Sequence, residues 1–508
     1  MIKSIKKILA NRVIVGGILI LVQFLIVIHF LWRLHTESPL FHTSFQVIST
    51  LIVIWLARKE DNPAYKISWI ILIFAFPIVG GIFYLFWGNT PLNKASMIKL
   101  HKLDRNSLNL ANLPSLSEEI ASIDLNYERI YNYVIHAGHF EAFPTSNCEY
   151  HKLGEEFFKS LLYNLKKAEK FIFLEYFIVE NGKMWDSILE ILIEKAKNGV
   201  EVRFMYDDAG CLGTLPSKYH KKLANLNINC VRFNPFRPTL QTYLNNRDHR
   251  KICVIDGEIG YMGGINLADE YINERERFGH WKDMGIVFDG EAISNLTLMF
   301  LELWEFSCDT PSLDYTKYLA KKKAPTKGYI QPFSDSPLDN YNIGENVYMQ
   351  IINSAKKYVY ITTPYLILDN EMITALIIAS QSGVDVKIIT PFVPDKKYVH
   401  PVTCSFYPQL IDAGVKIYEY TPGFMHGKVI IADDNIGVVG TINMDFRSFY
   451  MHFECGTILY DCPVLSDIKK DILDTLSVSE EISSDDFSKT PHFKRFIYSI
   501  LRIFSPMM

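Results

Sequence analysis

Two segments of the chain carry the same pattern of chemically active residues. One begins HRKICVID at His249, and the other begins HGKVIIAD at His426. In both segments a lysine follows the histidine by two residues, an aspartate by seven and an asparagine by seventeen. The matched residues are His249, Lys251, Asp256 and Asn266 in the first copy, and His426, Lys428, Asp433 and Asn443 in the second. A pattern of this length that occurs twice is highly specific.

These residue types suit the transfer of a phosphate-linked group. The lysines supply positive charge and the asparagines supply amide donors, so together they would hold the oxygens of an anionic phosphodiester. A histidine near its pKa can attack phosphorus in one copy and move a proton in the other. We therefore expect one shared cleft in which the two copies take different roles. The symmetry of the pattern does not tell which histidine attacks.

The same residue types also occur in other roles. A single histidine ahead of a strand is usually a packed or surface residue, and a single lysine is usually a solvated charge. The matched duplication argues against both readings. Histidine and aspartate are also metal ligands, but the neighbouring lysines oppose a cation, and the chain contains no H-E-x-x-H motif. We expect neither a metal nor another cofactor.

The spacing within each copy is that of a strand. Residues i and i+2 of a strand point to the same face, so each histidine and its lysine project together. The apolar runs ICVI and VIIA continue the strands into the core, which places Asp256 and Asp433 at the far ends. There they would support the motif instead of touching substrate. Gly263, Gly264 and Gly440 are expected where the chain turns tightly or lets a ligand approach its backbone.

Two carboxylates downstream of the motifs could orient the imidazoles. A working histidine is usually held through its second ring nitrogen by a carboxylate or carbonyl. Asp283 lies in HWKDMGIVF and Glu454 lies in MHFECGTIL, each just ahead of or within an expected strand. The alternative is a pair of exposed carboxylates at strand ends. The distance from motif to carboxylate differs between the halves, which weakens the match.

The sequence around the motifs also repeats. Each half shows a strand, a helix, a strand and a further strand before its histidine. The expected elements are 171–179, 185–197, 200–206 and 227–233 in the first half, and 358–367, 372–381, 384–390 and 415–420 in the second. This order predicts a mixed sheet covered by helices. We expect two such α/β domains, residues 148–325 and 326–508, packed face to face with pseudo-twofold symmetry.

The N-terminal part of the chain is strongly apolar. Val13 to Trp32, Phe41 to Ala57 and Ile67 to Trp87 carry no formally charged side chain. Crossing a bilayer takes about 20 apolar residues, so we expect a transmembrane region over residues 1–88 with two or three helices. A polar connector should follow over 89–147, with a loop around Pro114. Flanking lysines and arginines give conflicting orientations, so the side of the membrane stays open.

The overall composition narrows the choice of partner. The chain has 508 residues and a formal net charge of −4, which does not favour a polyanion such as nucleic acid. Its eight cysteines show no C-x-x-C pair, so we expect them to be reduced and structural. The oligomeric state does not follow from the sequence.

The paired motifs resemble the HKD motifs of the phospholipase D superfamily. The segment from Asp61 to Gly88 and the ending FSPMM are similar to bacterial cardiolipin synthases. The resemblance implies duplicated α/β sandwich domains and a multi-pass protein of the cell membrane. It implies a phosphatidyl transfer between two phosphatidylglycerol molecules, giving cardiolipin and glycerol. His249 would form the phosphohistidine intermediate, His426 would be acid and base, and the lysines and asparagines would hold the phosphoryl oxygens. One departure is Thr441, which stands where the first copy has Gly264.

Two rival functions remain at this stage. A hydrolase of the same superfamily, either a phospholipase or a nuclease, would use water in place of the second lipid. The apolar N-terminal region and the absence of net positive charge disfavour a nuclease. A non-catalytic membrane scaffold is the other rival, and the intact motifs in both halves argue against it.

Overall fold

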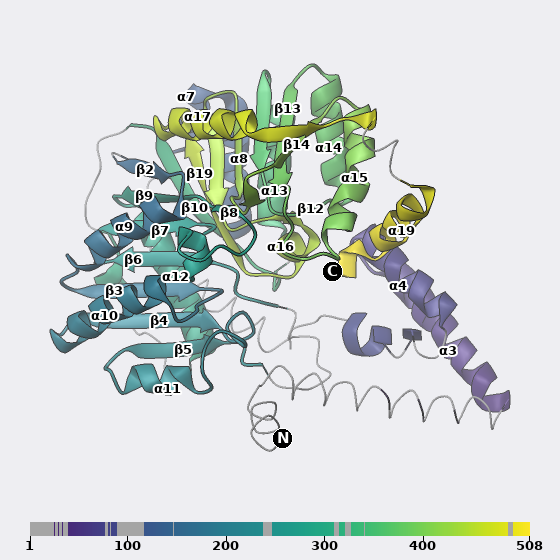
Figure 1. Ribbon diagram of the computed structural model, residues 1–508, viewed down its shortest axis with the longest axis horizontal. Coiled ribbons are helices and arrows are strands. Elements are labelled where there is room, and N and C mark those ends of the chain that lie inside the picture. The colour runs from purple at the N-terminus through teal and green to yellow at the C-terminus, as the bar shows by residue number, and fades with distance from the viewer. Residues whose placement is uncertain are drawn as a thin grey trace.

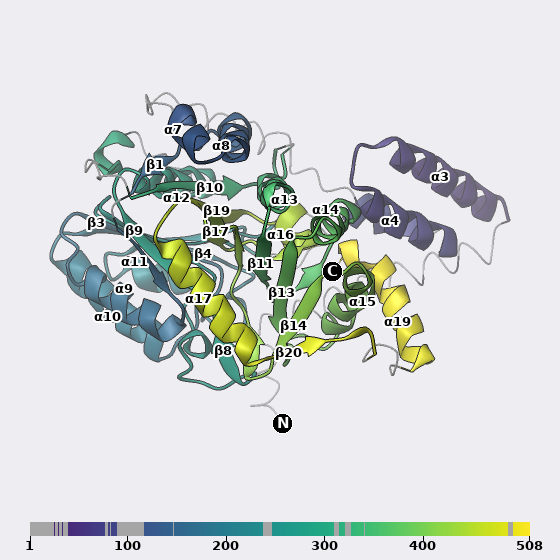
Figure 2. The same ribbon diagram turned by 90° about the horizontal axis from the view of Figure 1, so that it is seen from above.

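Two mixed β-sheets face each other, with helices on their outer faces and between them (Figure 1, Figure 2). The computed structural model describes residues 39–76, 80–81, 83–88, 116–145, 147–236, 246–308, 314–320, 327–339, 341–485 and 491–507, together with Leu25, His29 and Arg33.

The first sheet has seven strands in the order β2-β9-β7-β6-β3-β4-β5. Strands β3, β4 and β5 are parallel, whereas β6, β7 and β9 pair antiparallel. The strands are β2 (Cys148–His151), β3 (Phe171–Tyr176), β4 (Glu201–Asp207), β5 (Asn229–Phe233), β6 (Lys251–Ile255), β7 (Ile259–Gly263) and β9 (Gly285–Asp289).

The second sheet has nine strands in the order β1-β10-β19-β17-β16-β11-β13-β14-β20. They are β1 (Phe143–Pro144), β10 (Tyr329–Asp335), β11 (Tyr358–Thr362), β13 (Asp385–Pro391), β14 (Lys416–Tyr420), β16 (Val429–Ala432), β17 (Ile436–Gly440), β19 (Glu454–Tyr460) and β20 (Ser479–Ile482). The edge strand β1 precedes the first half of the chain but joins this second sheet.

The two sheets share one strand order. The run β9-β7-β6-β3-β4-β5 corresponds to β19-β17-β16-β11-β13-β14. The register agrees as well, because Phe173 pairs with Val254 and Tyr360 pairs with Ile431, each five residues beyond a motif histidine. The predicted mixed α/β sheets and their duplication are therefore confirmed. The predicted boundaries between the halves stay a prediction.

Each motif strand is buried on both faces. In β6, Ile252 and Val254 belong to the core between the two sheets, whereas Cys253 and Ile255 belong to the core under the outer helices. Alternate residues of a strand point to opposite faces, so a strand between two cores needs a continuous apolar run. The motif residues ICVI supply that run, and it carries Lys251 at the start of the strand toward the end where the two sheets meet.

Three layers of helices complete the halves. Outside the first sheet lie α9 (Gly154–Leu165), α10 (Lys183–Lys197) and α11 (Tyr219–Ala224). Outside the second lie α8 (Leu125–Gly138), α13 (Ile343–Ser354), α14 (Asn370–Gln381) and α15 (His400–Asp412). The core between the sheets also contains α12 (Ile293–Ser307) and α17 (Val464–Ser477). The helices predicted at 185–197 and 372–381 are thus present as α10 and α14.

Several short elements lie outside the two main sheets. Strand β8 (His280–Lys282) pairs parallel with β15 (Gly423–Met425), and β12 (Leu366–Ile367) pairs with β18 (Met444–Asp445). The other short elements are η3 (Asp269–Ile272), η4 (Thr316–Tyr318), α7 (Ser117–Ile123) and α16 (Phe446–Tyr450). The β8–β15 pair joins the two halves directly.

The N-terminal helices meet the end of the chain. They are α3 (Pro39–Arg58), α4 (Pro63–Ala75) and the π-helical turn η1 (Tyr84–Gly88), and the chain closes with α19 (His492–Ile503) and η5 (Ser505–Met507). The Ser68 hydroxyl in α4 donates to the Ile503 carbonyl at 2.5 Å, and Met507 packs on the α3–α4 core. Both views place α19 beside α4 (Figure 1, Figure 2).

The predicted membrane region is described only in part. The apolar run from Val13 to Trp32 lies outside the described residues, apart from Leu25 and His29. The run from Phe41 to Ala57 lies within α3, and the third run begins as α4. Among the helices that the structure describes, none has both the length and the apolar content needed for a bilayer span. Residues 89–115 of the predicted connector, with Pro114, are also outside the described part.

Candidate active site

Each motif histidine is anchored to the other half of the molecule. The backbone N–H of His249 donates to the carbonyl of Phe453 at 2.9 Å, and that of His426 donates to the carbonyl of Lys282 at 2.8 Å. Both acceptors immediately precede the carboxylates that were predicted to orient the imidazoles. The two copies of the motif therefore meet at one place between the sheets.

The orienting carboxylates cross between the halves. Nδ1 of His249 lies 2.9 Å from both carboxylate oxygens of Glu454, and Nδ1 of His426 lies 2.5 Å from Oδ2 of Asp283. Both carboxylates are fully buried. Each one follows the motif of its own half but serves the histidine of the other half. With Nδ1 held in this way, Nε2 is the ring nitrogen left for a substrate.

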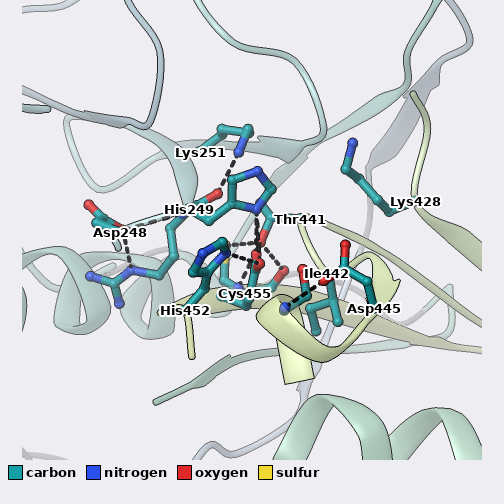
Figure 3. A network of polar contacts seen from close by, with 12 residues as sticks. Asp248, His249, Lys251, Lys428, Thr441, Ile442, Asp445, His452 and Cys455 are labelled. Carbon is teal, nitrogen blue, oxygen red and sulfur yellow. Dashed lines mark hydrogen bonds and ion pairs between the residues drawn. The ribbon is translucent and has the colours of Figure 1, made fainter. Parts of the chain in front are cut away.

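The two lysines stand close to the histidine backbones. The Lys251 ammonium donates to the carbonyl of His249 at 2.5 Å, and the Lys428 ammonium donates to the carbonyl of His426. Figure 3 shows Lys251 directed toward His249 on the opposite side from His452. Burial lowers the pKa of Lys251 to about 8 and that of Lys428 to about 7. Both lysines therefore lose their proton more easily than an exposed lysine does, and a bound anion would favour the protonated form.

The histidines are neutral in this environment. Burial, followed by the charges of Lys251 and Lys428, holds the pKa of His249 well below its usual range. Burial and the same two ammonium groups act in the same direction on the pKa of His426. A neutral imidazole has a free lone pair for attack on phosphorus, or for accepting a proton from an alcohol. The site can thus supply both a nucleophile and a base.

Two groups contact Nδ1 of His426. Its Nδ1 lies 2.5 Å from Asp283 and 2.9 Å from the Lys428 ammonium. A single nitrogen cannot donate to the first group and accept from the second at the same time. Burial raises the pKa of Asp283 to about 7, close to the lowered pKa of Lys428. Asp283, His426 and Lys428 therefore form one proton-sharing group, which suits an acid and base.

The two asparagines are not equivalent. Asn266 is fully engaged, because its Oδ1 accepts from the N–H of Ile178 at 2.9 Å and its Nδ2 donates to the Tyr271 hydroxyl at 2.8 Å. In contrast, Oδ1 of Asn443 is buried and has no hydrogen-bond partner within the described part of the chain. The tyrosine ring held by Asn266 stands 5.4 Å from the ring of His426. Asn266 thus also supports the wall of the site.

The motif aspartates lie apart from the histidines. Asp256 follows β6 and accepts the backbone N–H groups of Glu169, Lys170 and Phe171, each at 2.7 Å. Asp433 does the same for the three residues 356–358 at the start of β11. These carboxylates close the turns at the far ends of the motif strands. Both aspartates therefore lie at the strand ends where the sequence placed them, and they hold backbone N–H groups instead of facing the histidines.

The motif glycines admit protein atoms. A Cβ at Gly263 would lie 2.5 Å from the backbone of β9, and one at Gly440 would lie 2.4 Å from the backbone of β19. A Cβ at Gly264 would lie 2.1 Å from Oδ1 of Asp283. None of the three has a positive φ. The expectation of a tight turn or a ligand at these glycines is therefore wrong, because neighbouring strands and Asp283 fill the space.

The departure at Thr441 has a clear structural reason. Its hydroxyl donates to Oε2 of Glu454 at 2.5 Å and also bonds with the backbone of Cys455. The equivalent Gly264 instead leaves room for the shorter Asp283. Each half therefore fits its own carboxylate. Thr441 supplies a hydroxyl to Glu454, and Gly264, which has no side chain, leaves the space that Asp283 fills. Sequence comparison of the two copies showed this difference but not its purpose.

Two ring contacts were missed by the sequence analysis. Trp281 lies two residues before Asp283, and its ring centroid is 5.2 Å from that of His426. His452 lies two residues before Glu454, and its ring is 5.6 Å from that of His249. Trp281 and His452 stand at the same position, two residues before the carboxylate, and this shared position in the sequence could have identified them. Burial lowers the pKa of His452 to about 4, so this third imidazole is neutral near pH 7.

Two groups of described residues have the spacing of metal ligands. One comprises His249, His452 and Glu454, and the other comprises His400, Cys404 and Glu419. The first group belongs to the site itself and lies near the ammonium groups of Lys251 and Lys428, which electrostatically oppose a cation. Its geometry is better explained by the Glu454 bond to His249.

Comparison with known proteins decides the family. The family described as "Cardiolipin synthase, PLD-like domain" matches residues 161–304 and 348–475, more than half of the chain. The chain belongs to the cardiolipin synthase family of the phospholipase D superfamily. The family described as "Phospholipase_D-nuclease N-terminal" matches residues 47–89.

Curated relatives extend this family match along the chain. A cardiolipin synthase of Alkalihalophilus pseudofirmus is 36% identical over 94% of this chain and 95% of its own length. Cardiolipin synthase 2 of Bacillus cereus is 34% identical over 91% of both chains. The crystal structure of phosphatidylserine synthase from Haemophilus influenzae covers 75% of this chain and 99% of its own, with a TM-score of 0.58 and 13% identity. That structural likeness supports the fold alone.

We expect Thr441→Val to lower kcat for phospholipid turnover by about 10- to 100-fold. The substitution keeps the volume but removes the hydroxyl that bonds Glu454 at 2.5 Å, and loss of a hydrogen bond to a buried carboxylate costs about 1–3 kcal/mol. Thr441→Ser should retain most of the activity. Steady-state kinetics, with thermal melting to verify folding, is the measurement. Equal kcat values for the valine variant and wild type would rule out this role of the hydroxyl.

We also expect kcat/KM to fall as the pH rises through 7 to 8. The pKa values of Lys428 and Lys251, about 7 and about 8, mean that each lysine is charged below its pKa and neutral above it. Loss of either charge weakens the attraction of the free enzyme for a phosphodiester, and kcat/KM reports the free enzyme. A pH profile in detergent micelles tests this expectation. A profile that stays flat or rises up to pH 9 would contradict it.

Proposed function

We propose that this protein is a cardiolipin synthase that joins two phosphatidylglycerol molecules into cardiolipin and glycerol. The observation that carries the proposal is the crossed pair of imidazole–carboxylate contacts, His249 with Glu454 and His426 with Asp283. It supplies two differently placed histidines at one phosphate site. Family membership and relatives named cardiolipin synthase support the choice of reaction.

The first step uses His249 as the nucleophile. Its neutral Nε2 attacks the phosphorus of the first phosphatidylglycerol, and the bond between phosphorus and the headgroup glycerol oxygen breaks. Neutral His426 gives its Nε2 proton to the departing oxygen, while its Nδ1 takes up a proton from the neighbouring Asp283 or Lys428. Glu454 stabilises the cationic imidazole that forms. Lys251, Lys428 and Asn443 surround the position where negative charge grows.

In the second step an alcohol attacks and gives up its proton, whereas in the first step an alcohol left and took one. The terminal hydroxyl of a second phosphatidylglycerol attacks the phosphorus, and the bond between phosphorus and His249 breaks. The hydroxyl proton passes to His426, which is again neutral and able to accept it. Exclusion of water at this stage favours cardiolipin over phosphatidic acid. The buried histidines, each only 7% exposed, are consistent with that requirement.

The protein's surface supports a place at the cell membrane. On α19, Phe493, Phe496, Ile497 and Ile500 form an exposed stripe at helical spacing. The other side of α19 packs on α15, where the Arg502 guanidinium lies 4.3 Å above the ring of Phe406. Exposed apolar side chains of α3 and α4 add to this surface: Val47, Ile48, Leu51, Ile54, Trp55, Ile67, Ile71 and Phe74. A bilayer is the partner that an apolar face of this kind fits.

We expect purified full-length protein to convert labelled phosphatidylglycerol to cardiolipin and glycerol. His249→Ala and His426→Ala should each reduce cardiolipin formation by at least about a thousandfold, because each removes one chemical role. His136→Ala on α8, outside the site, is the matched control. Thin-layer chromatography of the products is the measurement. Phosphatidic acid as the single product would favour a hydrolase, and full activity of both histidine variants would reject catalysis at this site.

We expect the exposed stripe of α19 to touch lipid in proteoliposomes. A photoreactive benzoylphenylalanine replacing Phe496 should cross-link to acyl chains on illumination, because that side chain is 62% exposed on the apolar face. The same replacement at Leu473, an exposed residue of α17, should give no lipid adduct. Mass spectrometry of the cross-linked protein makes the comparison. Equal labelling at both positions, or none at position 496, would contradict membrane contact by α19.

A further inference from the structure

Condensation of two phospholipids brings two phosphates close together. The first phosphate reacts, and the acceptor lipid keeps its own phosphodiester charge while its hydroxyl attacks. In the product the two phosphates are joined through a single glycerol. In the proposed function, Lys251, Lys428 and Asn443 hold the reacting phosphate. A second anion-binding position should therefore exist beside the first, and the following inference rests on the proposed function.

Lys396 supplies a third positive charge near the histidines. It lies on the loop between β13 and α15, and its side chain is exposed, whereas Lys251 and Lys428 are buried. Its ammonium contributes, after burial and the motif lysines, to lowering the pKa of both His249 and His426. The ring beneath it, Tyr365, directly precedes β12, and β12 pairs in parallel with β18, which directly follows Asn443. Lys396 therefore lies beside a motif asparagine.

The ammonium of Lys396 is available to a ligand. It lies 4.8 Å from the centre of the Tyr365 ring, and the Tyr365 hydroxyl donates to the neighbouring Asp395 at 2.6 Å. No hydrogen bond or ion pair engages the ammonium among the residues that the structure describes. The charge of Lys396 also acts to lower the pKa of Asp445, but that carboxylate caps α16 by accepting the N–H of Ser448 at 2.8 Å. The lysine is positioned by an aromatic ring but is not neutralised by an acid.

The aligned loop of the first half, within the described residues, lacks an equivalent cation. The paired residues Phe173 and Arg203 of the first sheet correspond to the paired residues Tyr360 and Lys387 of the second. The difference in residue number between Arg203 and Lys387 then aligns Lys396 with Leu212. Residues 208–213 of the first half include an aspartate but no lysine or arginine. The symmetry of the site is therefore broken by one charge on the second half. The two lipids also differ in role, since only one of them is cleaved.

We propose that Lys396 binds the phosphate of the acceptor phospholipid and so forms an acceptor subsite beside the shared histidine site. The charged contact places the acceptor's terminal hydroxyl near the phosphorus bound to His249. That hydroxyl oxygen forms the new bond to phosphorus, the bond to the imidazole nitrogen breaks, and the proton goes to His426. A neutral acceptor without a phosphate gains nothing from this contact. Water, glycerol and phosphatidylglycerol are then distinguished by Lys396.

The test compares two reactions of the same intermediate in detergent micelles. Cardiolipin formation uses an acceptor with a phosphate, whereas exchange of labelled glycerol into phosphatidylglycerol uses an acceptor without one. Lys396→Gln should lower cardiolipin formation by about 10- to 100-fold, the value of one charge-assisted hydrogen bond. It should have much less effect on glycerol exchange, and the fraction of phosphatidic acid should rise. Lys396→Arg keeps the charge and should retain most of the synthesis.

Lys397→Gln is the matched control, because Lys397 is the exposed neighbour on the same loop. It should change neither reaction. Equal losses of synthesis and exchange in Lys396→Gln would overturn the acceptor subsite, and so would unchanged synthesis in that variant. Failure of the wild-type protein to make cardiolipin while still exchanging glycerol would instead reject the proposed function, and the subsite with it.

Discussion

The structure depends on two buried carboxylates that each serve the opposite half. Glu454 holds His249, and Asp283 holds His426. Leaving a buried carboxylate without its hydrogen-bond donor costs about 1–3 kcal/mol, and separating the halves would leave two carboxylates in that state. The backbone bonds from each histidine to the strand ahead of the carboxylate follow from the same crossing. Neither half can form its own part of the site alone, which explains why the two motifs act as one.

The halves are duplicated in fold but adapted separately in detail. Thr441 bonds Glu454, whereas Gly264 makes room for Asp283. Such pairwise differences convert a symmetrical scaffold into a site with unequal histidines. One imidazole lies beside a third histidine, and the other lies in an aromatic surround that includes Trp281. A reaction with a nucleophile and a separate acid and base requires this kind of inequality, and the scaffold provides it without altering its strand order.

The parts that the sequence predicted well are those with local signals. Alternation and length identified the strands and helices, and the repeated spacing identified the histidines and lysines. Asp283 and Glu454 were recognised as candidates, but their crossing was not, since it depends on how two separate sheets pack. The same limit applies to Asn266, whose amide bonds Ile178 and Tyr271. Contacts between residues far apart in the sequence produce no periodic pattern in it. The partners of the carboxylates and of Asn266 could therefore be assigned only from the structure.

Burial of charge explains how such a site could act through its own side chains. Desolvation lowers the pKa of Lys251 and Lys428 to about 8 and about 7, while it raises that of Asp283 to about 7. Groups that ordinarily titrate far apart are thereby brought to the same pH range, where a proton moves between them at little cost. A phosphodiester that binds here favours the charged form of the lysines and so changes which groups hold the protons. Substrate binding and proton placement are therefore coupled through the burial of these groups.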